Sequence, residues 1–144
     1  MKVFCVLIVF FVCSCVGIKN PSSDYPIIYK DLEKALKNKD KVIALSLAGG
    51  ELKDFPMLIL ELENLEYLNL SLNKISSLPK DINKLQKLKI LDLMDNRIEK
   101  LPMELSYLKN LKRVNLAYNP VLEEDLIFLK KSLPDCLFIY YLEL

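Results

Sequence analysis

A repeat at one fixed interval constrains this chain more than any other feature of its sequence. The interval that separates Leu45 from Leu68 recurs along the 144-residue chain, and a shift by that interval superimposes the apolar positions. The first two columns contain Leu45, Leu68, Leu91 and Val114, and then Leu47, Leu70, Leu93 and Leu116. A largely polar column of Gly50, Asn73, Asn96 and Asn119 follows, and then Leu52, Ile75, Ile98 and Val121. Repetition with a period of about 20 to 50 residues is typical of solenoids, in which each unit packs against its neighbours.

Each unit contains the parts of one turn of such a solenoid. Its first two apolar columns are separated by one residue, and this alternation predicts a short strand with its leucines on one face. A Leu-Pro step follows, as in Leu78-Pro79 and Leu101-Pro102. It predicts the start of a return segment, because Pro fixes φ and suits the first turn of a helix. Apolar residues three positions apart in that segment predict a short helix or a 3₁₀ turn.

Together the columns form the pattern L-x-x-L-x-L-x-x-N-x-L-x-x-L-P-x-x-I-x-x-L-x-x, and over residues 42–133 the chain resembles the leucine-rich-repeat family in its bacterial form. The resemblance implies an α/β fold, a leucine-rich-repeat solenoid. Such a solenoid has a short curved parallel sheet on its concave side and short helices or 3₁₀ turns on its convex side. The resemblance also implies a ladder of Asn side chains that hydrogen-bond the backbone after each strand. Because Gly50 occupies the Asn position of the first unit, we expect the ladder to start at Asn73.

We expect five segments along the chain. They are a signal peptide at 1–15, a flexible tether at 16–25, an N-terminal capping helix at 26–41, the repeats at 42–123 and a C-terminal cap at 124–144. Caps are needed because an open solenoid exposes an apolar end and an unpaired strand edge. The N-terminal helix is placed around Ile28 to Asn38, where apolar residues share one face. The C-terminal cap combines a helix from Glu124 to Ser132 with a strand at about 137–142, and Cys136 between them is expected to be a small buried hydrophobe.

The first fifteen residues have the composition of an export signal. An unbroken apolar run from Val3 to Cys13 follows Lys2 and is too short to span a bilayer. The run ends in Val12-Cys13-Ser14-Cys15, which resembles the lipobox of bacterial lipoproteins. The resemblance implies a lipid on Cys15 and attachment to the membrane of the bacterial cell envelope. Two alternatives stay open: cleavage near Cys15 that releases a soluble secreted protein, and an uncleaved anchor.

Side chains that point outward on the predicted strands are candidates for binding a partner. In leucine-rich-repeat proteins the concave sheet is the usual binding face, so the resemblance implies a protein partner there. The candidates are Tyr67, Asn69, Ile90, Asp92, Met94, Arg113, Asn115 and Tyr118. Tyr and Arg are favoured interface anchors. The alternative is that these are ordinary solvent-facing residues, with Asp92 and Arg113 as a cross-strand ion pair.

Composition argues against several other functions. The chain contains no His, which removes the commonest general base and metal ligand, and we expect no metal and no cofactor. The adjacent acids Glu123, Glu124 and Asp125 fit the first turn of a helix rather than a catalytic pair. Without Lys2, the 20 basic residues become 19 and equal the 19 acidic ones, which gives no electrostatic case for nucleic acid. We therefore expect a protein-binding scaffold and not an enzyme. The alternative is a soluble secreted or intracellular interaction or assembly subunit.

Overall fold

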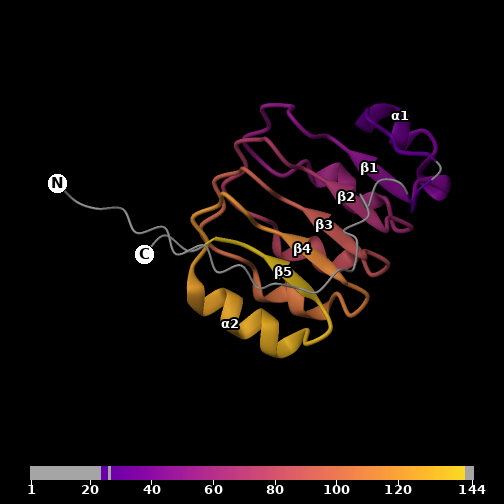
Figure 1. Cartoon of the computed structure of the whole chain (residues 1–144). Coiled ribbons are helices and arrows are strands. Elements are labelled where there is room, and N and C mark those ends of the chain that lie inside the picture. Colours follow the sequence, from indigo (N-terminus) through magenta and orange to yellow (C-terminus); the bar gives the residue numbers. More distant parts are fainter. Residues whose placement is uncertain (1–23, 26, 142–144) are drawn as a thin grey trace.

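The computed structural model describes residues 24–25 and 27–141, and within them five short parallel strands form one sheet. The expected signal peptide, Cys15 and nearly all of the expected tether lie outside the described residues. The strands are β1 (Ala44–Ser46), β2 (Tyr67–Asn69), β3 (Ile90–Asp92), β4 (Arg113–Asn115) and β5 (Leu137–Ile139). Their order in the sheet is their order along the chain, so each unit packs against the unit before it (Figure 1).

Short 3₁₀ helices form the layer opposite the sheet. They are η3 (Met57–Glu61), η4 (Lys80–Lys84) and η5 (Met103–Tyr107). Each begins directly after a proline, and Pro56, Pro79 and Pro102 have φ values of −68°, −71° and −66°. The proline therefore fixes the point at which the chain turns back, as the sequence predicts. A parallel sheet on one side and 3₁₀ turns on the other make the expected solenoid.

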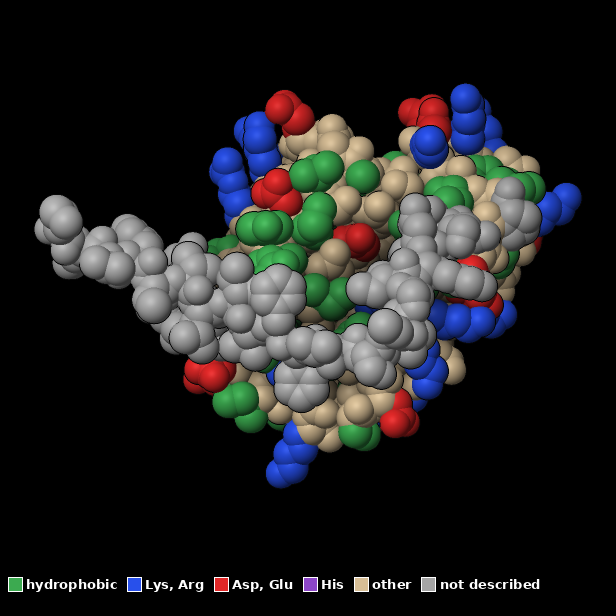
Figure 2. Space-filling view, in the orientation of Figure 1, with side chains coloured by type: hydrophobic (Ala, Val, Ile, Leu, Met, Phe, Trp, Pro, Cys, Tyr) green, Lys and Arg blue, Asp and Glu red, His purple; other side chains and the backbone are tan. Residues whose placement is uncertain are grey.

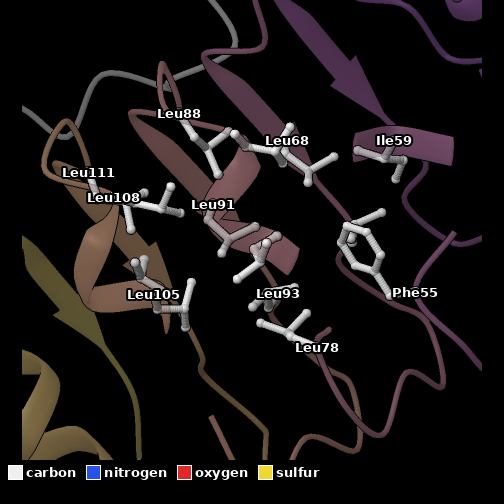
Figure 3. Packing of buried hydrophobic residues seen from close by; sticks show 14 of the residues in the cluster. Phe55, Ile59, Leu68, Leu78, Leu88, Leu91, Leu93, Leu105, Leu108 and Leu111 are labelled. Atoms are coloured by element: carbon white, nitrogen blue, oxygen red, sulfur yellow. The ribbon is translucent and has the colours of Figure 1, made fainter. Parts of the chain in front are cut away.

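The core fills the space between these two layers. Leu68, Leu91 and Val114, from three successive strands, have no exposed surface. Figure 3 shows how leucines of the strands meet those of the return segments, with Leu91 and Leu93 among Leu78, Leu88 and Leu105. Fully burying one such side chain stabilises the fold by about 1.5–3 kcal/mol, so the stacked leucines account for most of the driving force.

The Asn ladder is present and begins at Asn73, as expected. Asn119 is representative: its Oδ1 accepts from the Ile98 amide at 3.0 Å, and its Nδ2 donates to the Leu93 carbonyl at 2.8 Å. Asn73 makes the corresponding bonds to the Leu52 amide at 2.9 Å and the Leu47 carbonyl at 3.0 Å. All three ladder residues are buried, and each satisfies backbone groups of two neighbouring units.

The residue before each ladder position has a left-handed backbone. Gly49, Leu72, Asp95 and Tyr118 occupy this column, with φ values of 71°, 57°, 54° and 58°. Glycine adopts this conformation freely, whereas a leucine or tyrosine is strained there. Leu72 and Tyr118 also expose 52% and 67% of their surface, so burial offsets only part of that strain.

The N-terminal cap differs from the expected helix over Ile28 to Asn38. The helix α1 covers only Leu32–Leu36, and a 3₁₀ turn, η2, follows at Lys39–Lys41. It starts late because Tyr29 pairs with the free edge of β1: its N–H donates to the Ala44 carbonyl at 3.0 Å and its carbonyl accepts from Ser46 at 2.8 Å. Asp31 then caps the helix by accepting from the Lys34 amide at 3.0 Å.

The C-terminal cap consists of the helix α2 (Glu123–Ser132) and the strand β5 (Figure 1). The side chain of Asp125 accepts a hydrogen bond from the Leu101 amide at 2.8 Å, which ties α2 to the unit before it. Cys136, expected to be buried, is half-buried and packs against the core. No helix among the described residues is long and apolar enough to cross a membrane.

Candidate functional site

Two rows of side chains cross the concave face of the sheet. The entry row, at the start of each strand, contains Ala44, Tyr67, Ile90, Arg113 and Leu137. The exit row, two residues further along each strand, contains Ser46, Asn69, Asp92, Asn115 and Ile139. Members of a row are in register on adjacent strands, so they lie about 4.8 Å apart along the sheet. Both rows face away from the core, because the residues between them point inward.

The middle of the exit row supports the turns that follow the strands. Asn69 accepts a hydrogen bond from the Ser71 amide at 2.8 Å, and Asp92 accepts one from Met94 at 3.1 Å. Asn115 does the same for Ala117 at 3.2 Å. Three of the predicted binding residues therefore hold their own backbone in shape, which leaves less of their polar capacity for a partner.

Asp92 and Arg113 do not form the cross-strand ion pair that the sequence offered as an alternative. They lie in different rows, and the register places Asp92 opposite Asn115. The Asp92 carboxylate accepts from the Asn115 side-chain amide at 3.1 Å. Among the described residues no carboxylate pairs with Arg113.

Tyr67 is the least accessible of the predicted binding residues. Only 4% of its surface is exposed, and its ring lies beside Tyr25, with the ring centroids 5.4 Å apart. Burial raises the pKa of the Tyr67 hydroxyl, although its hydrogen bond with the Asn69 side chain acts in the opposite direction. Tyr67 therefore belongs to the packing that covers β2 rather than to an open surface.

The accessible part of the concave face lies over β3, β4 and β5. Ile90, Met94 and Arg113 are partly exposed, and Tyr118 is open at the end of β4. In Figure 2 hydrophobic side chains of the described residues are visible on both sides of the grey atoms, and Lys and Arg lie mainly around the outline of the molecule. The structure thus places Ile90 and Arg113 side by side at the start of β3 and β4, whereas Met94 and Tyr118 follow the other ends of these strands, beyond the exit row.

Two residues of this surface were missed by sequence reasoning. Leu137 continues the entry row on β5, and Tyr141 lies against Tyr118 with the ring centroids 5.2 Å apart. Both are more than half exposed. The interval from Arg113 to its partner Leu137 is one residue longer than the repeat, and this shift removes the last strand from the repeat columns. The alternating run Leu137, Ile139 and Tyr141 is the signal that could have revealed them.

Nothing in the described part of the chain gathers three or more His, Cys, Asp or Glu side chains into a possible metal site. A shallow open hollow lies at the N-terminal end of the solenoid, beside Leu47, Leu52 and Pro56. Its lining is mostly apolar, with Lys30 and Ser46 as its polar side chains. Leu47 and Leu52 occupy core positions of the first unit but are only partly buried, because no further unit of the described chain stacks on them.

Comparisons with known proteins agree with this architecture. The family described as Leucine Rich repeats (2 copies) matches residues 63–105. A solved leucine-rich-repeat protein of Leptospira interrogans is 42% identical over 65% of this chain, with a TM-score of 0.62. This chain covers 24% of that protein's length. The leucine-rich-repeat ectodomain of the receptor kinase SOBIR1 from Arabidopsis thaliana is 27% identical over 62% of this chain and 50% of its own, with a TM-score of 0.48. No curated protein matches.

The chain therefore folds as a leucine-rich-repeat solenoid. Its sheet, its 3₁₀ layer and its Asn ladder define this class, and the similarity to the Leptospira protein supports it independently. Proteins of this class are typically scaffolds for protein interactions and are generally not catalysts.

Proposed function

We propose that this protein is a scaffold that binds a protein partner on the concave face over β3, β4 and β5. The observation that carries the proposal is the accessible run of Ile90, Arg113 and Leu137 in the entry row, with Met94 and Tyr118 also accessible past the other ends of β3 and β4. Aromatic residues, Met and Arg are enriched in the centres of protein interfaces. The short strands beneath them are fixed by the sheet and the ladder, so the side chains are presented by a rigid support.

The other half of the concave face supports binding less well. On β1 the outward residues are Ala44 and Ser46, which are small. On β2 Tyr67 is covered by Tyr25, and Asn69 is engaged with the Ser71 amide. The available face is therefore short, so we expect a modest affinity that increases when several copies act together.

Site-specific photocrosslinking tests this proposal. A photoreactive amino acid is placed at Met94 on the concave side or at Met103 on the convex side, where Met103 is 60% exposed. Because both positions replace an accessible methionine, they form a matched pair. We expect a discrete adduct in cells from position 94 and none of that mass from position 103. Equal adducts from both positions, or none from position 94, would contradict concave binding.

We further propose that Cys15 is lipidated and that the protein is displayed on the bacterial cell envelope, which would hold it at the membrane through its acyl chains. This proposal rests on the resemblance of Val12-Cys13-Ser14-Cys15 to a lipobox. The test is the intact mass of the protein purified from the membranes of its own cells. A mass that fits a chain starting at Cys15 with added acyl groups supports it. An unlipidated chain cut nearby makes it a secreted binder, and an uncut chain removes the export argument.

One observation favours a second candidate function, an assembly subunit. At the other end of the sheet Tyr29 pairs with the edge of β1, whereas among the described residues β5 is an edge strand, and it carries Leu137 with 55% of its surface exposed. An apolar edge strand is a template for pairing with another chain. Concentration-dependent association in light scattering that is lost with Leu137→Lys, but retained when Met94 is changed to Ala, would favour assembly over ligand binding.

A further inference from the structure

Arg113 has an unusual setting on the concave face. Its neighbours in register on either side are Ile90 of β3 and Leu137 of β5. Both neighbours are apolar, so the Arg113 side chain leaves the sheet between two hydrocarbon side chains of the accessible surface. Arg113 itself is partly exposed, which leaves its head within reach of a molecule lying on the sheet.

The described residues supply no counterion for this charge. The nearest acid in the sheet pattern, Asp92, is engaged with the Met94 amide and the Asn115 side chain. Lys89, one unit earlier, pairs with Glu66 at 2.9 Å, but Lys112 in the same column has no carboxylate partner among the described residues. Lys109 in the same turn donates to the Ser132 carbonyl at 3.4 Å and likewise has no carboxylate partner there.

The entrance to β4 is therefore locally basic, although the whole chain carries a net charge of only +1. Three cations lie close together in the sequence, at Lys109, Lys112 and Arg113. By contrast, the equivalent turn before β2 contains Glu61, Glu63 and Glu66. Two of those acids are paired, Glu61 with Lys39 and Glu66 with Lys89, so the cations at the entrance to β4 favour that part of the sheet for an anionic partner.

We infer that the partner presents an acidic side chain to Arg113, flanked by apolar side chains that pack on Ile90 and Leu137. A guanidinium group donates two parallel hydrogen bonds to a carboxylate, and apolar neighbours reduce competition from water. The occupant is a protein segment rather than a flat anionic membrane, because the cation lies within an apolar row on a concave face. This inference rests on the proposed concave binding and specifies the chemistry of the partner.

Selection from a random peptide library displayed on phage tests the inference. Peptides are fused by their C-termini, so any carboxylate that is selected comes from a side chain. The full chain, immobilised, is the target, and selected peptides are then measured as soluble ligands by fluorescence anisotropy. We expect enrichment of Asp or Glu with apolar residues beside it, and weaker binding at high salt.

Variants of the two arginines decide the role of the charge. Arg113→Gln should weaken binding of the selected acidic peptides by at least about tenfold. Arg113→Lys should weaken it by less, because lysine keeps the charge but cannot donate two parallel hydrogen bonds to a carboxylate. Arg97→Gln is the matched control: Arg97 is exposed and follows the ladder residue Asn96, outside both rows, so binding should not change. Circular dichroism of each variant checks that the fold is retained.

Three results would overturn the inference. The first is selection of peptides without acidic residues, or of none at all, and the second is acidic peptides that bind Arg113→Gln as well as the original chain. The third is Arg113-dependent binding to phosphatidylglycerol vesicles without any peptide preference, which would assign the charge to an anionic surface. In each case the photocrosslinking pair at Met94 and Met103 reports separately on concave binding, so failure of the two proposals can be distinguished.

Discussion

The side-chain amide of Asn96 lies 2.9 Å from the carbonyl oxygen of Leu70, a residue 26 positions earlier in the preceding unit. The same amide donates to the Leu93 carbonyl of its own unit at 3.0 Å, and its oxygen accepts from the Ile75 amide at 3.0 Å. With a further bond to the Met94 carbonyl at 3.4 Å, one buried side chain satisfies four backbone groups from two units, and it fixes the turn of each unit relative to the next.

Replacing Asn96 with Ala should lower the free energy of unfolding by roughly 1–3 kcal/mol, because buried backbone groups lose their partners. Asn110→Ala is the control, since the Asn110 side chain also donates to the preceding unit, to the Gln86 carbonyl at 2.8 Å, but is exposed. Urea denaturation followed by circular dichroism measures both variants. A loss below a few tenths of a kcal/mol for Asn96→Ala would show that the ladder contributes little to stability.

Truncating a core leucine should cost more than removing a ladder bond. Leu93→Ala is expected to lower the free energy of unfolding by about 2–5 kcal/mol, because Leu93 has no exposed surface and its loss leaves a cavity. Leu58→Ala, at a position 53% exposed on η3, is the control and should change stability much less. If the two variants unfold at the same urea concentration, the assignment of inward and outward positions is wrong.

The left-handed column offers a substitution that should not destabilise the protein. A non-glycine residue pays roughly 1–2 kcal/mol for this conformation, whereas glycine avoids that cost and instead loses about 0.5–1 kcal/mol in chain entropy. Leu72→Gly should therefore leave the melting temperature unchanged or raise it slightly. Leu72→Val should lower it, since a β-branched residue fits this φ poorly. Calorimetry measures the melting temperature of both variants. A clearly lower melting temperature for Leu72→Gly would mean that the exposed leucine makes a stabilising contact.

Cys136 should react slowly with alkylating reagents in the folded protein. Burial raises the pKa of its thiol from 9.0 to about 11, although the charge of Lys112 acts in the opposite direction. The thiolate is the reactive form, so the rate with iodoacetamide should keep rising up to about pH 11. Digestion and mass spectrometry isolate the Cys136 peptide from those of the other cysteines. The urea-unfolded chain is the control and should level off near the ordinary thiol pKa.

The same shift makes stability depend on pH. Because the folded-state pKa of Cys136 is raised, the thiol's contribution is complete below the unfolded pKa near 9 and is lost as the pH rises towards 11. The difference in unfolding free energy between the original chain and Cys136→Ala should therefore shrink over this range. A difference that stays constant would show that the thiol titrates alike in both states.

The repeat and the proline-led return segments could be predicted from the spacing of the residues, and the ladder from the resemblance to the leucine-rich-repeat family. The pairing of Tyr29 with β1 could not be predicted, because it depends on a strand edge that exists only once the sheet has formed. The same applies to Tyr67, which appears open in the sequence pattern but is covered by Tyr25, a residue distant from it in the chain. The outward position of Asn69, Asp92 and Asn115 predicts binding residues, but a polar residue two positions before a turn is also a recognisable turn-supporting signal.

The bonds of the ladder join each unit only to its neighbour, and this has an evolutionary consequence. An in-frame duplication of one whole unit between Asn73 and Asn119 would find matching partners on both sides and leave both caps untouched. An insertion that is not a whole number of units would break the column. A single duplication event could therefore lengthen the sheet and alter the spacing between Ile90 and Arg113. The range of molecules recognised would then change in one step, and the two ends of the protein would stay the same.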